Sequence, residues 1–433
     1  MAADVAKATN GILVGQNAHL SGVSFDSRSV RPGQLFVPIV AERDGHDFVL
    51  AALAAGAGAY LTTGKTFGRT SITVPDTLAA LLQLGAWGRN KLDAQLANRV
   101  IGITGSVGKT STKDFIAAAL GSVLRVTANE RSFNNDQGLP VTILNAGDDV
   151  QALVLEMGMR GFDEISRLCT VARPNIGVVT RVAPAHTERV GGIDGVARAK
   201  SELVQALDAS GFAVLNADDE RVAAMQSLTE ATVISYGVAP SATVRMTHCV
   251  LDERACASIT VESPWGKASW KMNVPGEHMA HNAVGAIAVA GVLGLDLQLA
   301  AVAIEAAVLS EMRMQHKVAR SGALIIDDSY NANPASLAAA LHALSATKAS
   351  RRIAVLGIMA ELSEPEQDHL QISRLAEQLG IELIAVGTDM YGVQSRTREE
   401  AAAALSAVEN SAAILIKGSR VAQLEKLVSL LIN

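Results

Sequence analysis

The chain has 433 residues, of which 49% are hydrophobic and only 3% aromatic, and its formal net charge is −6. This length predicts roughly two to four domains with sizeable buried cores. The charge balance, without any basic run, argues against a nucleic-acid partner. No stretch reaches the roughly 18 uninterrupted apolar residues of a membrane helix, and the N-terminus lacks a signal-peptide pattern. Because Cys169, Cys249 and Cys256 show no CxxC spacing, they indicate reduced thiols. We therefore expect a soluble, cytoplasmic, mainly α/β protein.

The pattern along the chain predicts three domains, at residues 1–95, 96–310 and 311–433. The first is a small α/β domain with short strands in QLFVPIV and AYLTT and a helix over 48–55. In the second, strands such as NRVIGI, ALVLEMG, NIGVVTRV, GFAVLNADD and ATVISYG alternate with helices, which favours a mostly parallel sheet. Residues 242–275 alternate like antiparallel strands, and a helix follows over 281–294. From residue 311, ALIIDDS, RIAVLGI, ELIAVG and AAILIKG predict a Rossmann-like C-terminal sheet.

A glycine-rich stretch at residues 104–108 separates a predicted strand over 100–103 from a predicted helix over 109–120. A strand, a glycine-rich turn and a helix N-terminus direct backbone N–H groups and the positive helix end at an anion. Lys109 would reach the terminal phosphates of a nucleotide, and the Thr110 hydroxyl would bind magnesium. The match is to the short form GxxGKT, because the longer GxxxxGK[ST] template would need a glycine at Ile103. The alternative is a strand–helix turn with a chance lysine.

Three further residues are candidates for metal or phosphate chemistry. Glu156 ends a buried strand, where ligands bind in open α/β sheets and where a carboxylate is costly without a cation. His186 follows another strand, and Lys200 lies in the helical stretch GVARAKSELV. Taken alone, Glu156 could instead face solvent, a lone histidine such as His186 is more often a structural hydrogen-bonding residue, and a lone lysine such as Lys200 is usually solvated.

A series of motifs along nearly the whole chain resembles the ATP-dependent Mur ligases. In chain order they are FDSRSVRPGQLFVPI, DGHDF, TGSVGKTSTK, FNNDQGLP, LEMGMRGFDEI, RPNIGVVTRVAPAH, ARAKSEL, NADD, PGEHMAHNAVGAIA, IDDSYNANPAS, VLGIMAEL and KGSR. GSVGKTSTK and DDSYNANP discriminate within the family. The ligase that adds the third residue typically has Asn in the loop and Asp-Tyr-Ala-His where this chain has Asp328-Ser329-Tyr330-Asn331. The resemblance is therefore to the member that adds D-alanyl-D-alanine to UDP-N-acetylmuramoyl-tripeptide.

This resemblance implies an ATP-dependent amide ligase of peptidoglycan precursor synthesis, working through an acyl phosphate. Its partners would be UDP-N-acetylmuramoyl-tripeptide and D-alanyl-D-alanine as small-molecule substrates. The charge balance and the short apolar runs argue against nucleic-acid and membrane partners, and a monomer is expected because no heptads or large apolar patch are visible. Its cofactors would be ATP and Mg²⁺ at two sites. Lys109 and a first magnesium on Thr110 and Glu156 would serve the β- and γ-phosphates. A second metal would lie near His186 and Lys200, with Lys200 carbamylated, because a plain ammonium would be repelled by the metal.

The resemblance also implies roles by position. Catalytic residues would be Lys109, His186 and Lys200, and ATP would be bound by Gly105, Ser106, Val107, Gly108, Lys109, Thr110, Ser111, Asn282, Arg313 and Asp328. The substrate would be bound by Ser27, Arg28, His46, Asn134 and Asn135. Local alternatives remain open for several of these: a helix N-cap at Asn282, a capped turn at Asp327-Asp328, a polar turn at DSRSVRPG and a β-turn at Asn134-Asn135.

The chain departs from the usual family pattern at Arg181, Ala183, Met279 and Ile358, none of which removes a predicted phosphate or metal ligand. Two other interpretations stay open. One is another amide ligase on the same scaffold, such as a folylpolyglutamate or cyanophycin-type synthetase, although those lack the DSR and DGHDF strings. The other is a P-loop switch that binds nucleotide without ligation, which a separate nucleotide-clamping third domain disfavours.

Overall fold

The structure is a computed structural model that describes residues 1–130, 133–184 and 187–432. Its contacts divide the chain into two compact units. Unit one consists of Met1–Gly102, Leu124–Met159 and Asp163–Asn175, and unit two of Ile103–Val123, Arg160–Phe162 and Ile176–Asn433. These units are defined by contacts and do not coincide with the domains predicted from the sequence pattern. The domain boundaries after residues 95 and 310 therefore stay a prediction. Among the described residues the strands form three sheets, mostly parallel.

Unit one begins with a five-stranded sheet in the order β1-β5-β4-β3-β2, antiparallel between β1 and β5 and parallel elsewhere. Its strands are β1 (Ile12–Val14), β2 (Val23–Ser24), β3 (Leu35–Phe36), β4 (Ala59–Thr62) and β5 (Ser71–Thr73). Its helices are α1 (Ala2–Ala8), η1 (Gly45–Phe48), α2 (Val49–Ala54), α3 (Thr77–Lys91) and α4 (Asp93–Leu96). The strands in QLFVPIV and AYLTT and the helix near 48–55 are thus confirmed.

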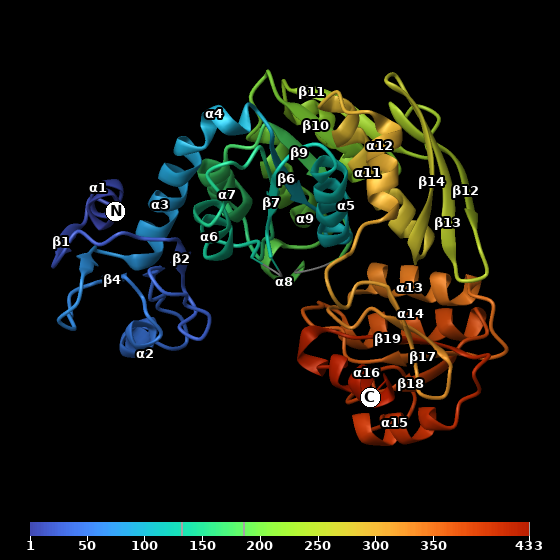
Figure 1. Ribbon diagram of the computed structural model, residues 1–433. Coiled ribbons are helices and arrows are strands. Elements are labelled where there is room, and N and C mark those ends of the chain that lie inside the picture. Colours follow the sequence, from blue (N-terminus) through green and yellow to red (C-terminus); the bar gives the residue numbers. More distant parts are fainter. Residues whose placement is uncertain (131–132, 185–186, 433) are drawn as a thin grey trace. The chain divides into compact units, whose positions relative to one another are not determined.

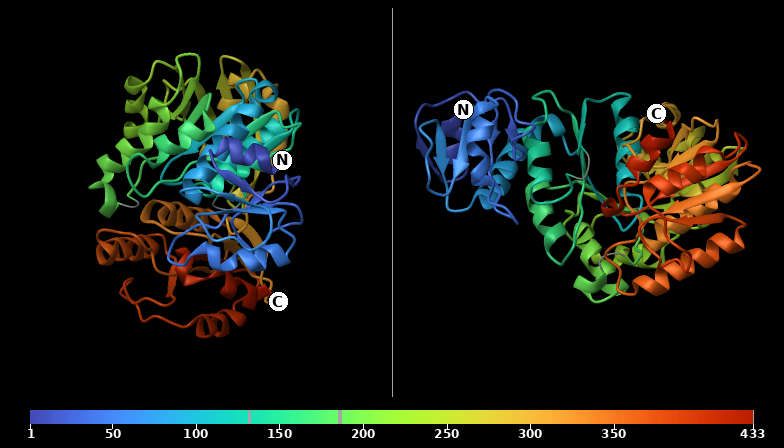
Figure 2. Two further views of the ribbon diagram at one scale, coloured as in Figure 1. Left: turned by 90° about the vertical axis from the view of Figure 1, so that its left-hand side faces the viewer. Right: turned by 90° about the horizontal axis from the view of Figure 1, so that it is seen from below.

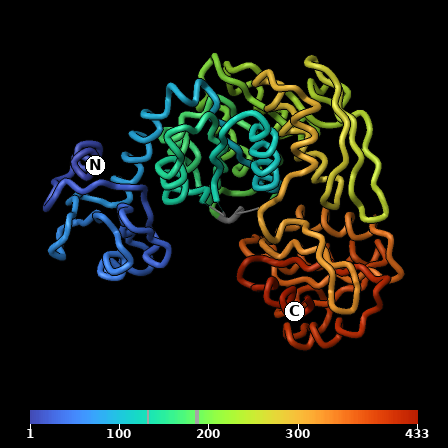
Figure 3. The backbone as a smooth tube through the Cα atoms, viewed as in Figure 1, coloured from blue at the N-terminus to red at the C-terminus, as the bar shows by residue number. Residues whose placement is uncertain are grey.

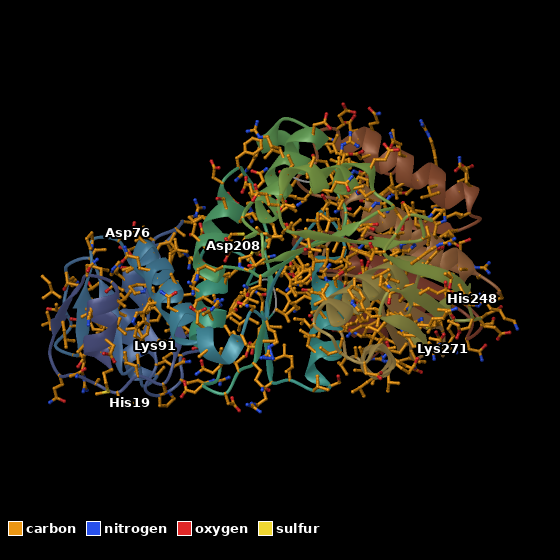
Figure 4. The ribbon with its side chains drawn as sticks, turned by 90° about the horizontal axis from the view of Figure 1, so that it is seen from above. His19, Asp76, Lys91, Asp208, His248 and Lys271 are labelled. Carbon is orange, nitrogen blue, oxygen red and sulfur yellow. The ribbon has the colours of Figure 1, made fainter. Side chains whose placement is uncertain are left out.

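Alternation along these strands builds two small cores on opposite faces of the sheet, in the part of the chain drawn in blue in Figure 2. Leu35 and Leu61 pack in a cluster with residues of α1 and α3, whereas Phe36 and Tyr60 pack with residues of α2. Helix α3 begins after Asp76, labelled in Figure 4, whose carboxylate accepts a hydrogen bond from the Ala79 N–H at 2.8 Å.

The remaining part of unit one carries the strand order β6-β8-β7 and two helices. These elements are β6 (Val100–Thr104), β7 (Val126–Ala128), α6 (Gly138–Leu144), β8 (Ala152–Glu156) and α7 (Glu164–Ala172). Strands β7 and β8 are parallel. Every residue of β8 is buried, as its continuous apolar sequence predicted, and the strand ends at Glu156. The boundary of unit one falls inside β6, after Gly102.

In unit two the end of β6 leads into α5, and the sheet continues as β9-β10-β11-β12-β13-β14. The strands are β9 (Ile176–Val179), β10 (Phe212–Asn216), β11 (Thr232–Gly237), β12 (Val244–Leu251), β13 (Cys256–Ser263) and β14 (Gly266–Pro275). The helices are α5 (Lys109–Gly121), α8 (Thr187–Val190), α9 (Ile193–Gln205), α10 (Glu220–Ala224), η2 (Met225–Leu228), α11 (Glu277–Val292) and α12 (Leu297–Glu305). Strands β12 to β14 are antiparallel, as predicted, and carry exposed polar residues such as His248 and Lys271 (Figure 4).

The C-terminal part of unit two is a sheet in the order β15-β16-β19-β17-β18, parallel except for β15. Its strands are β15 (Gln315–Val318), β16 (Leu324–Asp327), β17 (Arg352–Leu356), β18 (Glu382–Ala385) and β19 (Ala413–Lys417). Its helices are α13 (Pro334–Ala346), α14 (Pro365–Gln378), α15 (Arg398–Ser406), η3 (Arg420–Ala422) and α16 (Glu425–Ile432) (Figure 1). This is the Rossmann-like arrangement that the sequence predicted. No helix among the described residues is long and apolar enough to cross a membrane.

Candidate active site

The glycine-rich stretch forms a tight loop between β6 and the first residue of α5, Lys109. Gly105 and Gly108 have φ angles of +148° and +85°, a region that favours glycine. Gly108 is the N-cap residue of α5 and its cap is not closed by a side-chain hydrogen bond. Because the first N–H groups of a helix have no partner within the helix, the loop presents a positive end suited to phosphate.

The segment after β9, residues 180–183, forms hydrogen bonds with this loop. The Ser106 N–H donates to the Arg181 carbonyl at 2.6 Å, and the Ser106 hydroxyl donates to the Ala183 carbonyl at 2.8 Å. The Thr180 hydroxyl donates to the Val107 carbonyl at 2.6 Å. The loop is therefore fixed by side chains and backbone before any ligand arrives. Arg181 and Ala183, two departures from the family pattern, act here through their backbones.

A second layer of hydrogen bonds holds the segment after β9 in turn. Asn216, at the end of β10, donates from its side-chain amide to the Thr180 carbonyl at 2.7 Å. The Asp219 carboxylate accepts from the Val182 N–H at 2.9 Å and also caps α10. Sequence reasoning noticed the string NADD only as a motif and did not assign it this role. Its position directly after a buried strand, at the edge where ligands bind, was the available signal.

Asn282 lies against the phosphate loop. A Cβ atom added at Gly108 would collide with the Asn282 side-chain amide, so that the two are in close contact. Helix α11 begins at Glu277 with Gly276 as its N-cap, and Asn282 is therefore in its second turn. The alternative that Asn282 is a helix N-cap is wrong, as is the expected helix start near residue 281. The Asn282 amide also approaches the Met279 sulfur at 3.9 Å.

Two lysines of unit two stand near each other beside the loop. The Lys109 ammonium donates to the Gly105 carbonyl at 2.7 Å. Lys200 lies in α9, as its helical stretch predicted, and its side chain is buried. Burial lowers the pKa of Lys200 well below its usual range, and the nearby positive charge of Lys109 lowers it further. A buried amine with a lowered pKa is a group whose chemistry differs from that of a surface lysine.

Arg313 and Asp328 also belong to unit two. The Arg313 guanidinium donates to the Thr110 hydroxyl at 3.3 Å and stacks on the Tyr330 ring, 4.2 Å from its centroid. The Asp328 carboxylate forms an ion pair of 2.5 Å with Lys417, a buried residue that also donates to the Asn331 carbonyl. The alternative of a capped turn applies to the neighbouring residue, since Asp327 accepts hydrogen bonds from the Ser329 N–H and hydroxyl. Lys417 was not predicted as a site residue.

His278 sits beside this ion pair at the start of α11. Burial lowers the pKa of His278 to about 4, the positive charges of Lys417 and Arg181 also lower it, and the charge of Asp328 opposes them. His278 is therefore a neutral group among charged ones at neutral pH.

Glu156, Asn134 and Asn135 belong to unit one. The Glu156 side chain is buried and its Oε1 accepts from the Asn134 side-chain amide at 2.8 Å, while its backbone N–H donates to Asn129. The carboxylate thus points into a polar setting, and not to solvent. The side-chain oxygen of Asn135 accepts hydrogen bonds from the Gln137 and Gly138 N–H groups. Asn135 therefore has the local turn role that the sequence left open as an alternative.

The residues expected at the sugar-nucleotide end, Ser27, Arg28 and His46, lie in the N-terminal part of unit one. Arg28 is exposed and pairs with Asp26 at 2.8 Å, and the same carboxylate accepts the Arg28 N–H, as in a polar turn. His46 differs, because only 14% of its side chain is exposed. Its Nδ1 contacts the Asp44 carboxylate at 2.6 Å, and its buried Nε2 has no hydrogen-bond partner among the described residues.

The metal ligands predicted from the sequence are Thr110, Glu156, His186 and Lys200. His186 lies outside the described residues. Within residues 1–130, 133–184 and 187–432, no three His, Cys, Asp or Glu side chains gather to hold a metal ion. Thr110 in unit two carries a hydroxyl and Glu156 in unit one a carboxylate, and each is an oxygen donor of the kind that Mg²⁺ takes together with phosphate oxygens and water. Each side chain by itself therefore has the donor chemistry that a magnesium ion requires.

Two family models match the chain: the Mur ligase middle domain over residues 103–290, and the Mur ligase, glutamate ligase domain over residues 312–420. The UDP-N-acetylmuramoyl-tripeptide–D-alanyl-D-alanine ligase of Mycobacterium bovis is 40% identical, over 84% of this chain and 77% of its own. The enzyme of the same name from Escherichia coli is 32% identical over 97% and 95%. A crystal structure of MurF from Acinetobacter baumannii matches with a TM-score of 0.90 and 27% identity, covering 99% of this chain and 98% of that one.

The fold and the phosphate loop define an α/β nucleotide-binding protein with a Rossmann-like C-terminal sheet, which confirms the fold class predicted from the sequence. Together with the relatives, they assign the chain to the Mur ligase family.

Proposed function

We propose that the chain is an ATP-dependent amide ligase that adds D-alanyl-D-alanine to UDP-N-acetylmuramoyl-tripeptide, a step of peptidoglycan precursor synthesis. Relatives of that name match most of the chain at 32–40% identity. The observation that carries the chemistry is the phosphate loop, held by the segment after β9 and contacted by Asn282 and Arg313. Adenine beside Asn282, phosphates at the start of α5 and ribose near Asp328 would fit this arrangement.

The reaction would proceed in two steps. The terminal carboxylate of the tripeptide attacks the γ-phosphorus of ATP, forming an acyl phosphate and releasing ADP. The free amine of D-alanyl-D-alanine then attacks the acyl carbon, loses a proton, and expels phosphate as the amide forms. The first step brings two anions together, so catalysis depends on cations placed where charge develops. Lys109 and Arg313, both in unit two, place positive charge beside the loop and Thr110.

Magnesium is part of the proposal, with one ion on Thr110 and Glu156 and a second near His186 and Lys200. When bound, such ions neutralise the phosphate oxygens and polarise them. Lys200 is proposed to be carbamylated. The lowered pKa of Lys200 supports this, since only the neutral amine can attack carbon dioxide, losing a proton as the carbamate forms. The product carries a negative charge and would suit a metal where an ammonium would not.

The sugar nucleotide is proposed to bind near Ser27, Arg28 and His46, and the reacting peptide end near Asn134 and Asn135. For the first of these sites, His46 gives the best support. Asp44 fixes one ring nitrogen, so the buried Nε2 is oriented and left without a partner among the described residues. A buried polar atom of this kind is costly unless a ligand satisfies it.

The test is product formation. With ATP, Mg²⁺, UDP-N-acetylmuramoyl-tripeptide and D-alanyl-D-alanine, mass spectrometry should find the pentapeptide, with either meso-diaminopimelate or lysine at position three. ATP turnover should be negligible until both the acid and the amine are present, and the corresponding dipeptide substrate should not replace the tripeptide. Absence of the pentapeptide with both tripeptides would refute the proposal.

The same assay separates the alternatives. A different Mur-type or folylpolyglutamate-like ligase would consume ATP only with its own acid and amine. A nucleotide switch would hydrolyse ATP with neither. We further expect a monomer in the cytoplasm, without nucleic-acid or membrane partners.

A further inference from the structure

The segment that joins α12 to β15 is tied to helix α5 by a carboxylate with no role in the proposed reaction. The path of this segment can be followed in Figure 3. The Ser310 N–H donates to Oδ2 of Asp114 at 2.8 Å, and the Ser310 hydroxyl donates to Oδ1 at 3.2 Å. Only 13% of the Asp114 side chain is exposed, and it also pairs with the buried Lys113 at 3.0 Å. Asp114 is therefore a shielded acceptor that binds both donors of one serine.

The backbone that follows Ser310 is unusual. Met312 and Met314 have φ angles of +59° and +51°, a left-handed conformation that residues other than glycine rarely adopt. Such conformations persist only where surrounding contacts impose them. The contacts here include a hydrogen bond from the Met312 N–H to Gln315 and one from the Met314 N–H to Asp328. The segment is thus held in a shape that the free chain would not favour.

The residue between the two methionines is Arg313, which reaches the Thr110 hydroxyl and stacks on Tyr330. Thr110 and Asp114 are four residues apart on α5, so they lie on the same face of the helix, one turn apart. The segment therefore touches this face twice within four residues, once through Ser310 and once through Arg313. Fixing Ser310 at Asp114 limits where the Arg313 guanidinium can lie relative to the phosphate loop.

We propose that Asp114 is a positioning residue for ATP: it anchors Ser310, and through the strained backbone it holds Arg313 at the phosphate loop. The proposal rests on the proposed function insofar as Arg313 serves a bound nucleotide. The anchor itself, from Asp114 to Ser310, is a property of the chain alone.

Two measurements on the full-length protein test it, with Asp114→Ala, Arg313→Ala and the double variant. The first is the dissociation constant of a fluorescent ATP analogue. Asp114→Ala should weaken binding about tenfold, as expected for lost hydrogen bonds to a charged group. The double variant should bind no more weakly than Arg313→Ala alone, because both changes act through the same guanidinium. Ser122→Ala, which removes a serine hydroxyl bond at the other end of α5, is the matched control and should change binding less than twofold.

The second measurement is amide hydrogen exchange of residues 309–314, which should become faster in Asp114→Ala and stay unchanged in Ser122→Ala. The proposal would be overturned if the affinity losses of the two single variants multiplied in the double variant. It would also be overturned if amide exchange of residues 309–314 were the same in Asp114→Ala as in the wild-type protein. If the wild-type protein bound no nucleotide, the proposed function would fail, while exchange would still decide whether the anchor exists. Should Asp114→Ala not fold, Ser310→Ala removes the hydroxyl that donates to Oδ1 of Asp114 and carries the same comparisons, with a smaller expected loss of affinity.

Discussion

The phosphate loop in unit two and the expected sugar-nucleotide region in unit one are built in opposite ways. Around the loop, partly buried groups form hydrogen bonds across long stretches of sequence, from Ser106 to Ala183 and from Arg313 to Thr110. In the N-terminal region the expected residues bond to near neighbours, as Arg28 does to Asp26 and His46 to Asp44. Long-range contacts fix the first region before a ligand binds, whereas in the second Arg28 is exposed and His46 is held by a residue two positions away. Groups fixed by long-range contacts can stabilise the charge that develops in a reaction, whereas groups held by local contacts can serve substrate binding.

The largest effect should come from the two lysines beside the loop. Lys109→Ala and Lys200→Ala should each lower kcat roughly 1000-fold, because each removes a group that faces developing charge. Rescue should tell them apart in assays at matched ionic strength. Methylamine should partly restore Lys109→Ala, and acetate should partly restore Lys200→Ala if a carbamate is present. Restoration of Lys200→Ala by methylamine alone would mean that this lysine works as a cation.

A smaller effect, on ATP affinity, should follow from a side chain placed at Gly108, next to Asn282. Gly108→Ala should weaken ATP binding about 100-fold, because its Cβ would collide with the Asn282 amide and displace the loop. Gly294→Ala is the matched control, since Gly294 also has a positive φ, of +71°, but faces open space. Both variants should lose about 1 kcal/mol of stability from backbone strain. Equal ATP affinity in the two variants would contradict a specific role of the contact with Asn282.

Unit one should give a more modest effect, confined to one substrate. His46→Ala should raise KM for the sugar nucleotide about tenfold, by the loss of one buried hydrogen-bonding group, and leave KM for ATP unchanged. Asp44→Asn should do the same more weakly, because it disturbs only the orientation of the ring. Asn282→Ala should show the reverse pattern in steady-state kinetics. A parallel rise in both KM values for either variant would erase the contrast between the two regions.

The smallest effect concerns pH. Burial holds the pKa of His278 near 4, against about 6.5 in an unfolded chain. Between these values the unfolded chain binds a proton that the folded chain does not, so stability falls as pH drops from 6.5 to 4. His278→Gln should remove about 2 kcal/mol of that fall, less than the full shift implies because the ring keeps some solvent contact. Thermal unfolding from pH 4 to 7 measures this, with His248→Gln as the exposed control.

Local patterns allowed much of this fold to be predicted. The buried strands, the phosphate loop and helices α5 and α9 follow from apolar runs, glycine positions and helical spacing. The short strands β1, β2, β5, β7 and β15 were not predicted, because two to four residues are too few to show alternation. The start of α11 was placed too late, although Gly276 and Glu277 offered an N-cap glycine and an acidic first turn.

The residues that hold the phosphate loop in place were harder to predict than the residues expected to bind ATP. Ser106 and Lys109 belong to one short motif, but Thr180, Asn216 and Asp219 reach that motif only through the fold. The same holds for Asp114 and Ser310, which are 196 positions apart. A single sequence shows neither the distance nor the partner in such cases, since each residue alone is equally compatible with a turn or a helix cap.

The two layers of hydrogen bonds behind the phosphate loop bear on how this motif can be transferred between proteins. Within residues 104–110, the Val107 carbonyl accepts a hydrogen bond from Thr180, whose own carbonyl accepts one from Asn216. The neighbouring Val182 N–H donates to the Asp219 carboxylate. A graft of the seven-residue motif into a foreign scaffold would leave these partners behind, and with them the shape of the loop. In chimeras between relatives, crossovers inside residues 104–219 would mix loop and supports of different origin. The span from β6 to the start of α10 is thus the smallest segment that carries the loop together with these hydrogen-bond partners. Crossover points in chimeras should therefore lie outside this span.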